Sequence, residues 1–161
     1  MCEYLAGGLR SASLSSDATL SELRAIAKRS GYYVQLGAEI PPPIRKEILR
    51  YVPESGGFVL FNVTSRDGPN WDCIDETLDS ELDFSRKKPV EEVAFFAFLR
   101  RAFAFSNPDE AIVIYTEGAS TGWFPLERRT CSLADFLESL YEYHDRPDRD
   151  VAGVYVITAE A

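Results

Sequence analysis

The sequence contains few of the residues that usually build catalytic or metal centres. Its 161 residues include one histidine and three cysteines, Cys2, Cys73 and Cys131. Structural zinc sites take ligands from close pairs such as C-x-x-C, and the sequence has no such pair. Small secreted proteins carry an even, dense set of cysteines that form disulfides. The cysteine pattern therefore predicts neither a zinc site nor a disulfide framework.

Long apolar runs are also missing. The longest unbroken run, Val93 to Leu99, is far shorter than the ~20 residues that span a bilayer. The first residues lack the basic segment and the apolar stretch of a signal peptide. We therefore expect a cytoplasmic protein that does not enter membranes.

Basic residues are in the minority. Lys and Arg total 17 against 26 Asp and Glu, which gives a formal net charge of −9. Nucleic acids and anionic membranes select basic surfaces, so the balance argues against both as partners. It suits a basic protein partner, or solubility alone. With 45% hydrophobic residues, a chain of this length can bury the core of one domain.

Catalytic and cofactor motifs are absent as well. The sequence has no G-x-S-x-G, no phosphate-binding glycine loop and no G-x-G-x-x-G. His144 precedes Asp145, which could orient an imidazole, but a helix C-terminus favours histidine without any function. Acids spaced along residues 79–83 resemble the start of a calcium loop, yet Phe84 and Val90 stand where that loop requires Gly and Glu. We assign no catalytic, cofactor-binding or metal-binding residue.

Helix signals occur at four places. A capping box at Thr19–Glu22 begins a helix that we expect to stop at Gly31. Pro43 predicts the first turn of a second helix. The stretch from Pro89 to Arg101 predicts a third, apolar on nearly every side and therefore buried in the centre. A second capping box at Ser132–Asp135 begins the last helix.

Strands and turns complete the prediction. We interpret the serine-rich residues 1–16 as a loose leader, with Gly7-Gly8 as turn material, and residues 17–161 as a single domain. Helices and strands mix without regular βαβ alternation, which predicts an α+β fold with a largely antiparallel sheet and a buried central helix. Dense β-formers predict strands, the fourth of them a returning hairpin arm, over 32–36, 58–63, 111–116, 123–128 and 151–158.

The most distinctive segment is the acidic strip, residues 71–84, which holds six acids and no base. Its apolar residues recur at close to helical spacing. One interpretation is an amphipathic segment with a solvated acidic face. The other is a docking surface, where charge steers a basic partner and an aromatic residue supplies a hot spot. The second interpretation assigns partner binding to Trp71, Asp72, Asp75, Glu76, Asp79, Glu81 and Asp83.

Two further segments carry a family resemblance. Residues Ile40–Tyr51 give a proline-initiated helix that ends in a tyrosine, followed by Gly56-Gly57-Phe58. Residues Ser132–Leu140 give a helix that follows a hairpin. Together they resemble the SUKH superfamily, a set of α+β modules that includes many bacterial toxin-immunity proteins. The resemblance implies a non-catalytic protein that binds and blocks a partner such as a toxin, and it assigns no role to any single residue.

The sequence therefore predicts a non-enzymatic acidic binding protein, an immunity or inhibitor protein for a basic effector or toxin. Two alternatives stay open. A small enzyme with scattered carboxylates would require a concave pocket whose acids have shifted pKa values. A regulatory or oligomerisation domain would require an exposed apolar patch.

Overall fold

The computed structural model describes residues 2–67, 74, 94–119, 122–123, 125–145 and 152–158. The described strands form one seven-stranded sheet in the order β2-β3-β1-β4-β7-β6, with β5 paired to β4. All pairs are antiparallel except β6 with β7. This confirms the predicted α+β class. The strands are β1 (Cys2–Arg10), β2 (Tyr33–Leu36), β3 (Val59–Thr64), β4 (Glu110–Ala119), β5 (Gly122–Trp123), β6 (Arg128–Cys131) and β7 (Gly153–Thr158).

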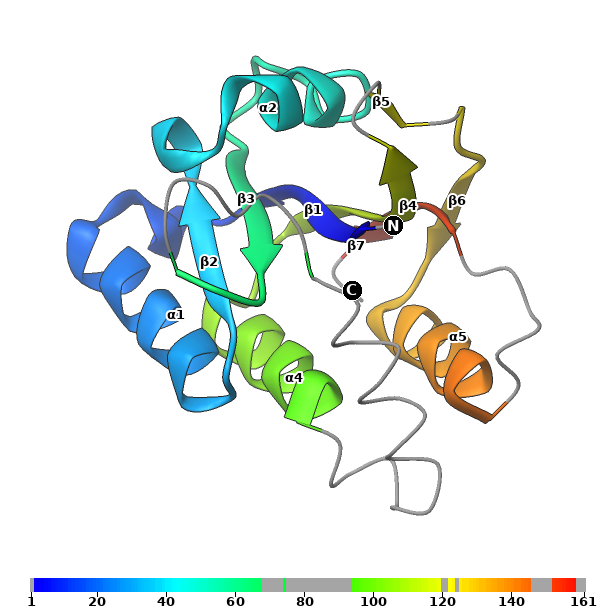
Figure 1. Cartoon of the computed structure of the whole chain (residues 1–161). Coiled ribbons are helices and arrows are strands. Elements are labelled where there is room, and N and C mark those ends of the chain that lie inside the picture. The colour runs from blue at the N-terminus through cyan, green and yellow to red at the C-terminus, as the bar shows by residue number, and fades with distance from the viewer. Residues whose placement is uncertain are drawn as a thin grey trace.

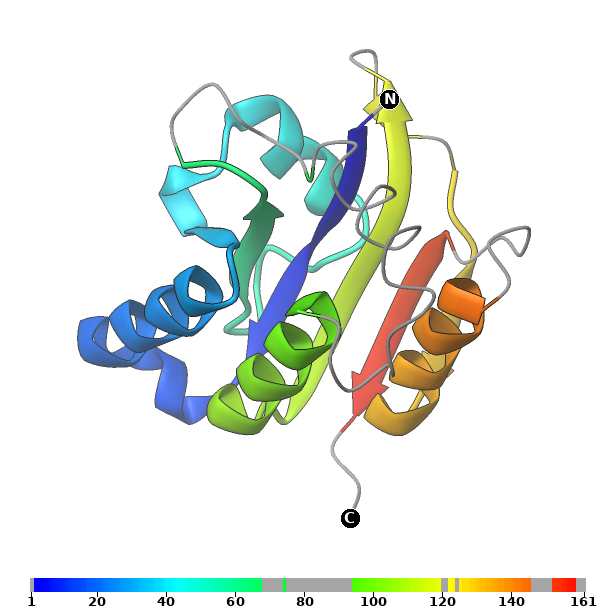
Figure 2. The same cartoon turned by 60° about the horizontal axis from the view of Figure 1, so that its bottom comes forward.

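Helices cover both faces of this sheet (Figure 1). The described ones are α1 (Asp17–Arg29), α2 (Pro42–Ile48), α4 (Ala94–Ser106) and α5 (Leu133–Asp145), with short 3-10 turns η1 (Ala12–Ser15) and η2 (Gly37–Glu39). Helices α1, α4 and α5 lie side by side on one face, which we name the three-helix face (Figure 2). Helix α2 covers the other, which we name the α2 face. Within the described residues, no helix combines the length and apolarity that a membrane span requires.

The expected loose leader is wrong, because residues 2–10 form the central strand of the sheet. β1 lies between β3 and β4 and pairs with both. Its side chains alternate between the two faces, and Tyr4, Leu5 and Ala6 are all buried. A strand that is buried on both faces shows no alternation of polar and apolar residues. The small residues of this segment therefore suggested a loop.

Gly7 and Gly8 lie within β1 and not in a turn, contrary to the prediction. A Cβ atom on Gly7 would lie 1.8 Å from the backbone oxygen of Ile112 in β4. A Cβ atom on Gly8 would lie 2.7 Å from Cγ1 of Val52. The glycines therefore allow β1 to approach β4 on one side and the α2 layer on the other.

The core of the three-helix face is apolar and rich in aromatic rings. Phe136 of α5 is fully buried, and its ring lies 4.9 Å from that of Tyr155 and 6.4 Å from that of Phe103, between centroids. Ile74 is also fully buried in this core. Three helices thus share one continuous core with the sheet.

Helix α4 lies between α1 and α5 on the three-helix face (Figure 2). Its apolar composition suggested that it would be enclosed on all sides, but part of its surface is exposed. Phe98, Leu99 and Phe103 are buried against the sheet, whereas Arg101 is exposed and Phe105 is 39% exposed. A helix that lies on one face of a sheet buries one stripe of its surface. The apolar residues of α4 exceed that stripe, so some remain at the surface.

Helix termini follow the expected chemistry with one shift. α1 begins one turn before the predicted box, because the Ser16 hydroxyl accepts a hydrogen bond from the Thr19 backbone N–H at 3.2 Å. It ends as predicted at Gly31, whose φ of 86° closes the helix while Tyr32 N–H donates to the Ala27 carbonyl at 2.9 Å. Ser132 caps α5 as predicted.

The remaining strands match the prediction closely. Strands expected over 32–36, 58–63, 111–116 and 151–158 correspond to β2, β3, β4 and β7. The expected hairpin arm over 123–128 is shorter, because Gly122 and Trp123 are the only described residues of this segment that pair back on β4. The chain then forms β6, an edge strand parallel to β7, which the sequence did not predict.

Candidate functional site

The residues predicted to bind a partner, Trp71 and the six acids that follow it, lie outside the described residues. Ile74 belongs to the same acidic strip, and its buried side chain packs with the core of the three-helix face. The strip is therefore attached to the folded domain at Ile74. The partner-binding assignment itself stays a prediction.

A concave site lined by charged and polar residues is a cleft of about 430 Å³ along β2, which we name the β2 cleft. Its floor is β2, one of the two terminal strands in the described sheet. Helix α1 forms one wall, and residues from β3 and the segments after β2 and β3 form the other. The lining residues are Arg24, Ala25, Lys28, Tyr33, Val34, Gln35, Glu39, Thr64 and Asp67.

Local folding explains how these residues come together. The turn after α1 reverses the chain, so that α1 packs against β2. Val34 and Leu36 are buried and Tyr33 and Gln35 are half-buried, which is the alternation of an amphipathic strand. Gly37, with a φ of 56°, then turns the chain into η2. Residues from separate elements thereby reach the same strand edge.

The two walls of the β2 cleft differ in charge. Arg24 and Lys28 lie four residues apart on α1 and therefore on one side of it. The opposite wall carries Glu39 and Asp67. Arg24 forms an ion pair with Glu39, which links α1 to η2. Among the described residues, Lys28 and Asp67 take part in no ion pair, so each is available to a ligand.

Buried polar side chains support the wall opposite α1. Asn62 is fully buried on β3, and its Nδ2 donates a hydrogen bond to Oε1 of Gln35 at 2.9 Å. Thr64 is also buried, and its hydroxyl donates to the backbone oxygen of Arg66 at 2.9 Å. These bonds fix the orientation of the polar groups beside the cleft. The β2 cleft can therefore bind ligands by charge and by hydrogen bonds.

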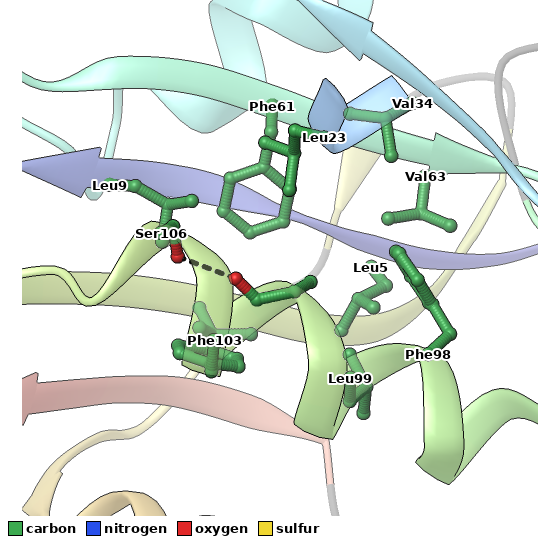
Figure 3. A pocket seen from close by; sticks show the side chains of 12 residues that line it. Leu5, Leu9, Leu23, Val34, Phe61, Val63, Phe98, Leu99, Phe103 and Ser106 are labelled. Carbon is green, nitrogen blue, oxygen red and sulfur yellow. Dashed lines mark hydrogen bonds between the residues drawn. The ribbon is translucent and has the colours of Figure 1, made fainter. Parts of the chain in front are cut away.

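A second cavity lies inside the core, between α1, α4 and the sheet (Figure 3). Its volume is about 40 Å³, and apolar side chains such as Leu5, Phe61 and Leu99 point into it. The one polar side chain shown, Ser106, donates its hydroxyl hydrogen to the Ala102 carbonyl at 2.7 Å. Ligand pockets usually measure roughly 300–1,000 Å³, so this space is a packing gap.

Other groups weighed in the sequence are distributed as follows. Within the described part of the chain, no three His, Cys, Asp or Glu side chains lie close enough to hold a metal ion. His144 lies in the last turns of α5. Cys131 stands just before the Ser132 cap, where burial raises the pKa of its thiol and the Asp135 carboxylate raises it further.

A groove of about 480 Å³ separates the end of α4 from the start of α5.

Sequence reasoning did not find the β2 cleft. Its residues come from four elements between positions 24 and 67, and no motif joins them. The one available signal was the pair of cations at helical spacing on α1. Comparison of the chain with protein-family models, with curated proteins and with solved structures found no match.

Proposed function

We propose that this chain is a non-enzymatic binding protein that holds a basic protein partner through the acidic strip. The partner class is a basic effector or toxin, and the chain acts as its immunity or inhibitor protein in the cytoplasm. The observation that carries the proposal is the concentration of charge. The strip contributes six of the nine net negative charges, although it comprises only residues 71–84.

The rest of the chain supports this location by contrast. Outside the strip, the other 20 acids nearly balance the 17 bases. Many described basic side chains form ion pairs with acidic side chains of the same chain. The two charges of each pair largely cancel, so these residues contribute little to the electrostatic potential that a partner meets. These ion pairs are Arg10–Glu110, Arg24–Glu39, Arg29–Glu22, Arg50–Glu47 and Arg129–Glu127.

Attachment of the strip at Ile74 favours binding. A segment joined to a folded core loses less conformational freedom when a partner docks than a free tail does. The negative charge of the strip should act mainly on the association rate, because opposite electrostatic potentials speed the encounter of two proteins. Salt screens this attraction over about 8–10 Å. We expect Trp71 to supply the desolvated contact that charge alone does not provide.

Affinity capture from the native host, followed by binding of the purified pair, tests the proposal. Replacement of Asp75, Glu76 and Asp79 by lysine should weaken the equilibrium affinity at least tenfold at low salt, because it reverses the field that the partner meets. A captured basic protein that is released at high salt would support the proposal.

The matched control reverses three exposed acids elsewhere, Glu54, Asp109 and Glu138, and so changes the net charge by the same amount. We expect this control to retain its affinity within about twofold, since it leaves all six acids of the strip unchanged. Equal loss in both variants would mean that the partner senses overall charge. Unchanged binding in the strip variant would exclude the strip as the interface.

A further inference from the structure

We propose that the β2 cleft, whose lining residues are not part of the acidic strip, is a second binding site for an extended segment of a partner protein. The segment adds to the sheet as a strand beside β2. Its side chains alternate in charge, acidic toward α1 and basic toward the opposite wall.

The position of β2 provides the main-chain part of this site. Among the described strands, β2 is a terminal one, and a terminal strand directs alternate N–H and C=O groups away from its neighbour. Addition of an extended peptide to such an edge is a recurrent mode of recognition. The four residues of β2 span about 13 Å, enough for four residues of a ligand.

The two edges of the sheet differ in how they resist pairing. Natural edge strands are commonly protected by charged side chains or proline. The opposite edge, β6, carries exposed Arg128 and Arg129. β2 has the sequence Tyr-Val-Gln-Leu, without charge or proline, and lies on the floor of a cleft. The protein therefore protects β6 and leaves β2 suited to an added strand.

The walls of the cleft define the side chains of the ligand. Successive side chains of a strand point to opposite sides, so an added strand would direct them in turn toward each wall. An acidic side chain fits toward Lys28 on α1, and the next residue fits toward Asp67 with a basic side chain. The volume of about 430 Å³ lies in the range of ordinary ligand sites.

A second copy of this chain fits less well than a foreign peptide. Antiparallel pairing of β2 with its own copy places both α1 helices on the same face of the joined sheet. Arg24 and Lys28 of the two copies would then line one side of the seam, where like charges repel. An acidic side chain from another protein meets the same wall favourably.

Two capped eight-residue peptides of equal composition test this site on the whole chain. One alternates Glu and Lys, and the other carries four Glu followed by four Lys. In an NMR titration at low salt, we expect the alternating peptide to shift the amide signals of Tyr33–Leu36 and to bind at least fivefold more tightly. Equal affinities, or shifts confined to the acidic strip, would overturn this inference and leave the proposed function standing.

Charge reversal in the walls provides the control. Lys28→Glu should weaken the alternating peptide about tenfold, whereas Lys46→Glu on the exposed surface of α2 should not. Lys28→Glu combined with Asp67→Lys exchanges the charges of the two walls. The alternating peptide should bind this double variant, because moving it by one residue along β2 directs its acidic side chains toward the opposite wall. Failure of that rescue, or a dimer held through β2 in light scattering, would contradict the proposal.

Discussion

The two faces of the sheet are covered in different ways. Three helices pack on one face around an apolar core that includes Phe136 and Tyr155. The other face is covered by the seven-residue α2, and beside it β3 buries the polar side chains of Asn62 and Thr64. Stability is therefore concentrated on the three-helix face, whereas the hydrogen-bonding groups that support the β2 cleft belong to the α2 face.

Truncation of one phenylalanine on each face should show the largest difference in stability between the two faces. Phe136→Ala should lower the free energy of unfolding by about 3–5 kcal/mol, because it opens a cavity in a fully buried aromatic cluster. Phe58→Ala on the α2 face should cost about 1–2 kcal/mol, since Phe58 is only half-buried. Urea unfolding measures both, and equal losses would contradict the ranking.

The two neighbouring glycines of β1 differ in what an added methyl group would meet. Gly8→Ala should cost about 1–3 kcal/mol, because its methyl group meets the side chains of Val52 and Phe58, which can shift. Gly7→Ala should cost more, because its methyl group would meet the Ile112 carbonyl in the neighbouring strand. Thermal unfolding of the two variants gives the order. A more stable Gly7 variant would show that the strands can separate freely.

The α5 cap tests a smaller contribution to the three-helix face. Ser132→Ala should lower the free energy of unfolding by about 1 kcal/mol, because the Asp135 N–H loses the hydroxyl that accepts from it at 3.1 Å. Ser132→Asp should restore most of the loss, since aspartate also caps helices well. Chemical denaturation distinguishes the variants, and an unchanged midpoint in the alanine variant would argue against the cap.

The smallest expected effect is a pH dependence at Cys131. Burial raises the pKa of this thiol, so the folded chain holds its proton to higher pH than the unfolded chain. Stability should therefore fall as pH rises above about 8.5, where the unfolded thiol ionises first. In a chain with serine at positions 2 and 73, alkylation of Cys131 should have a higher midpoint pH when folded than in denaturant. A lower folded midpoint would contradict the assignment.

The sequence predicted those parts of the fold that local chemistry determines. The Ser132 cap, the stop at Gly31 and four strands depend on nearby residues, and all are confirmed. β1 was missed because its glycines and the serine-rich residues after it are typical of a loop. The reason for Gly7, the close approach of β4, is visible only in the folded structure. The burial of α4 depends on which other elements pack against it. The spacing of apolar residues within one helix does not give that information.

The candidate sites divide in the same way. The acidic strip is contiguous, so composition alone revealed it. The β2 cleft assembles Lys28, Gln35 and Asp67 only after the chain folds, and no spacing in the sequence joins them. Buried polar pairs such as Asn62 with Gln35 likewise depend on the register of β2 against β3.

The association rate of the captured basic partner, measured over a range of salt concentrations, shows whether the partner docks on the acidic strip. We expect the natural chain and the Glu54, Asp109 and Glu138 reversal to associate fast at low salt and to slow steeply as salt increases. The Asp75, Glu76 and Asp79 reversal should associate slowly, with little salt dependence. If that strip variant keeps the rate and the salt dependence of the natural chain, the partner does not dock on the acidic strip.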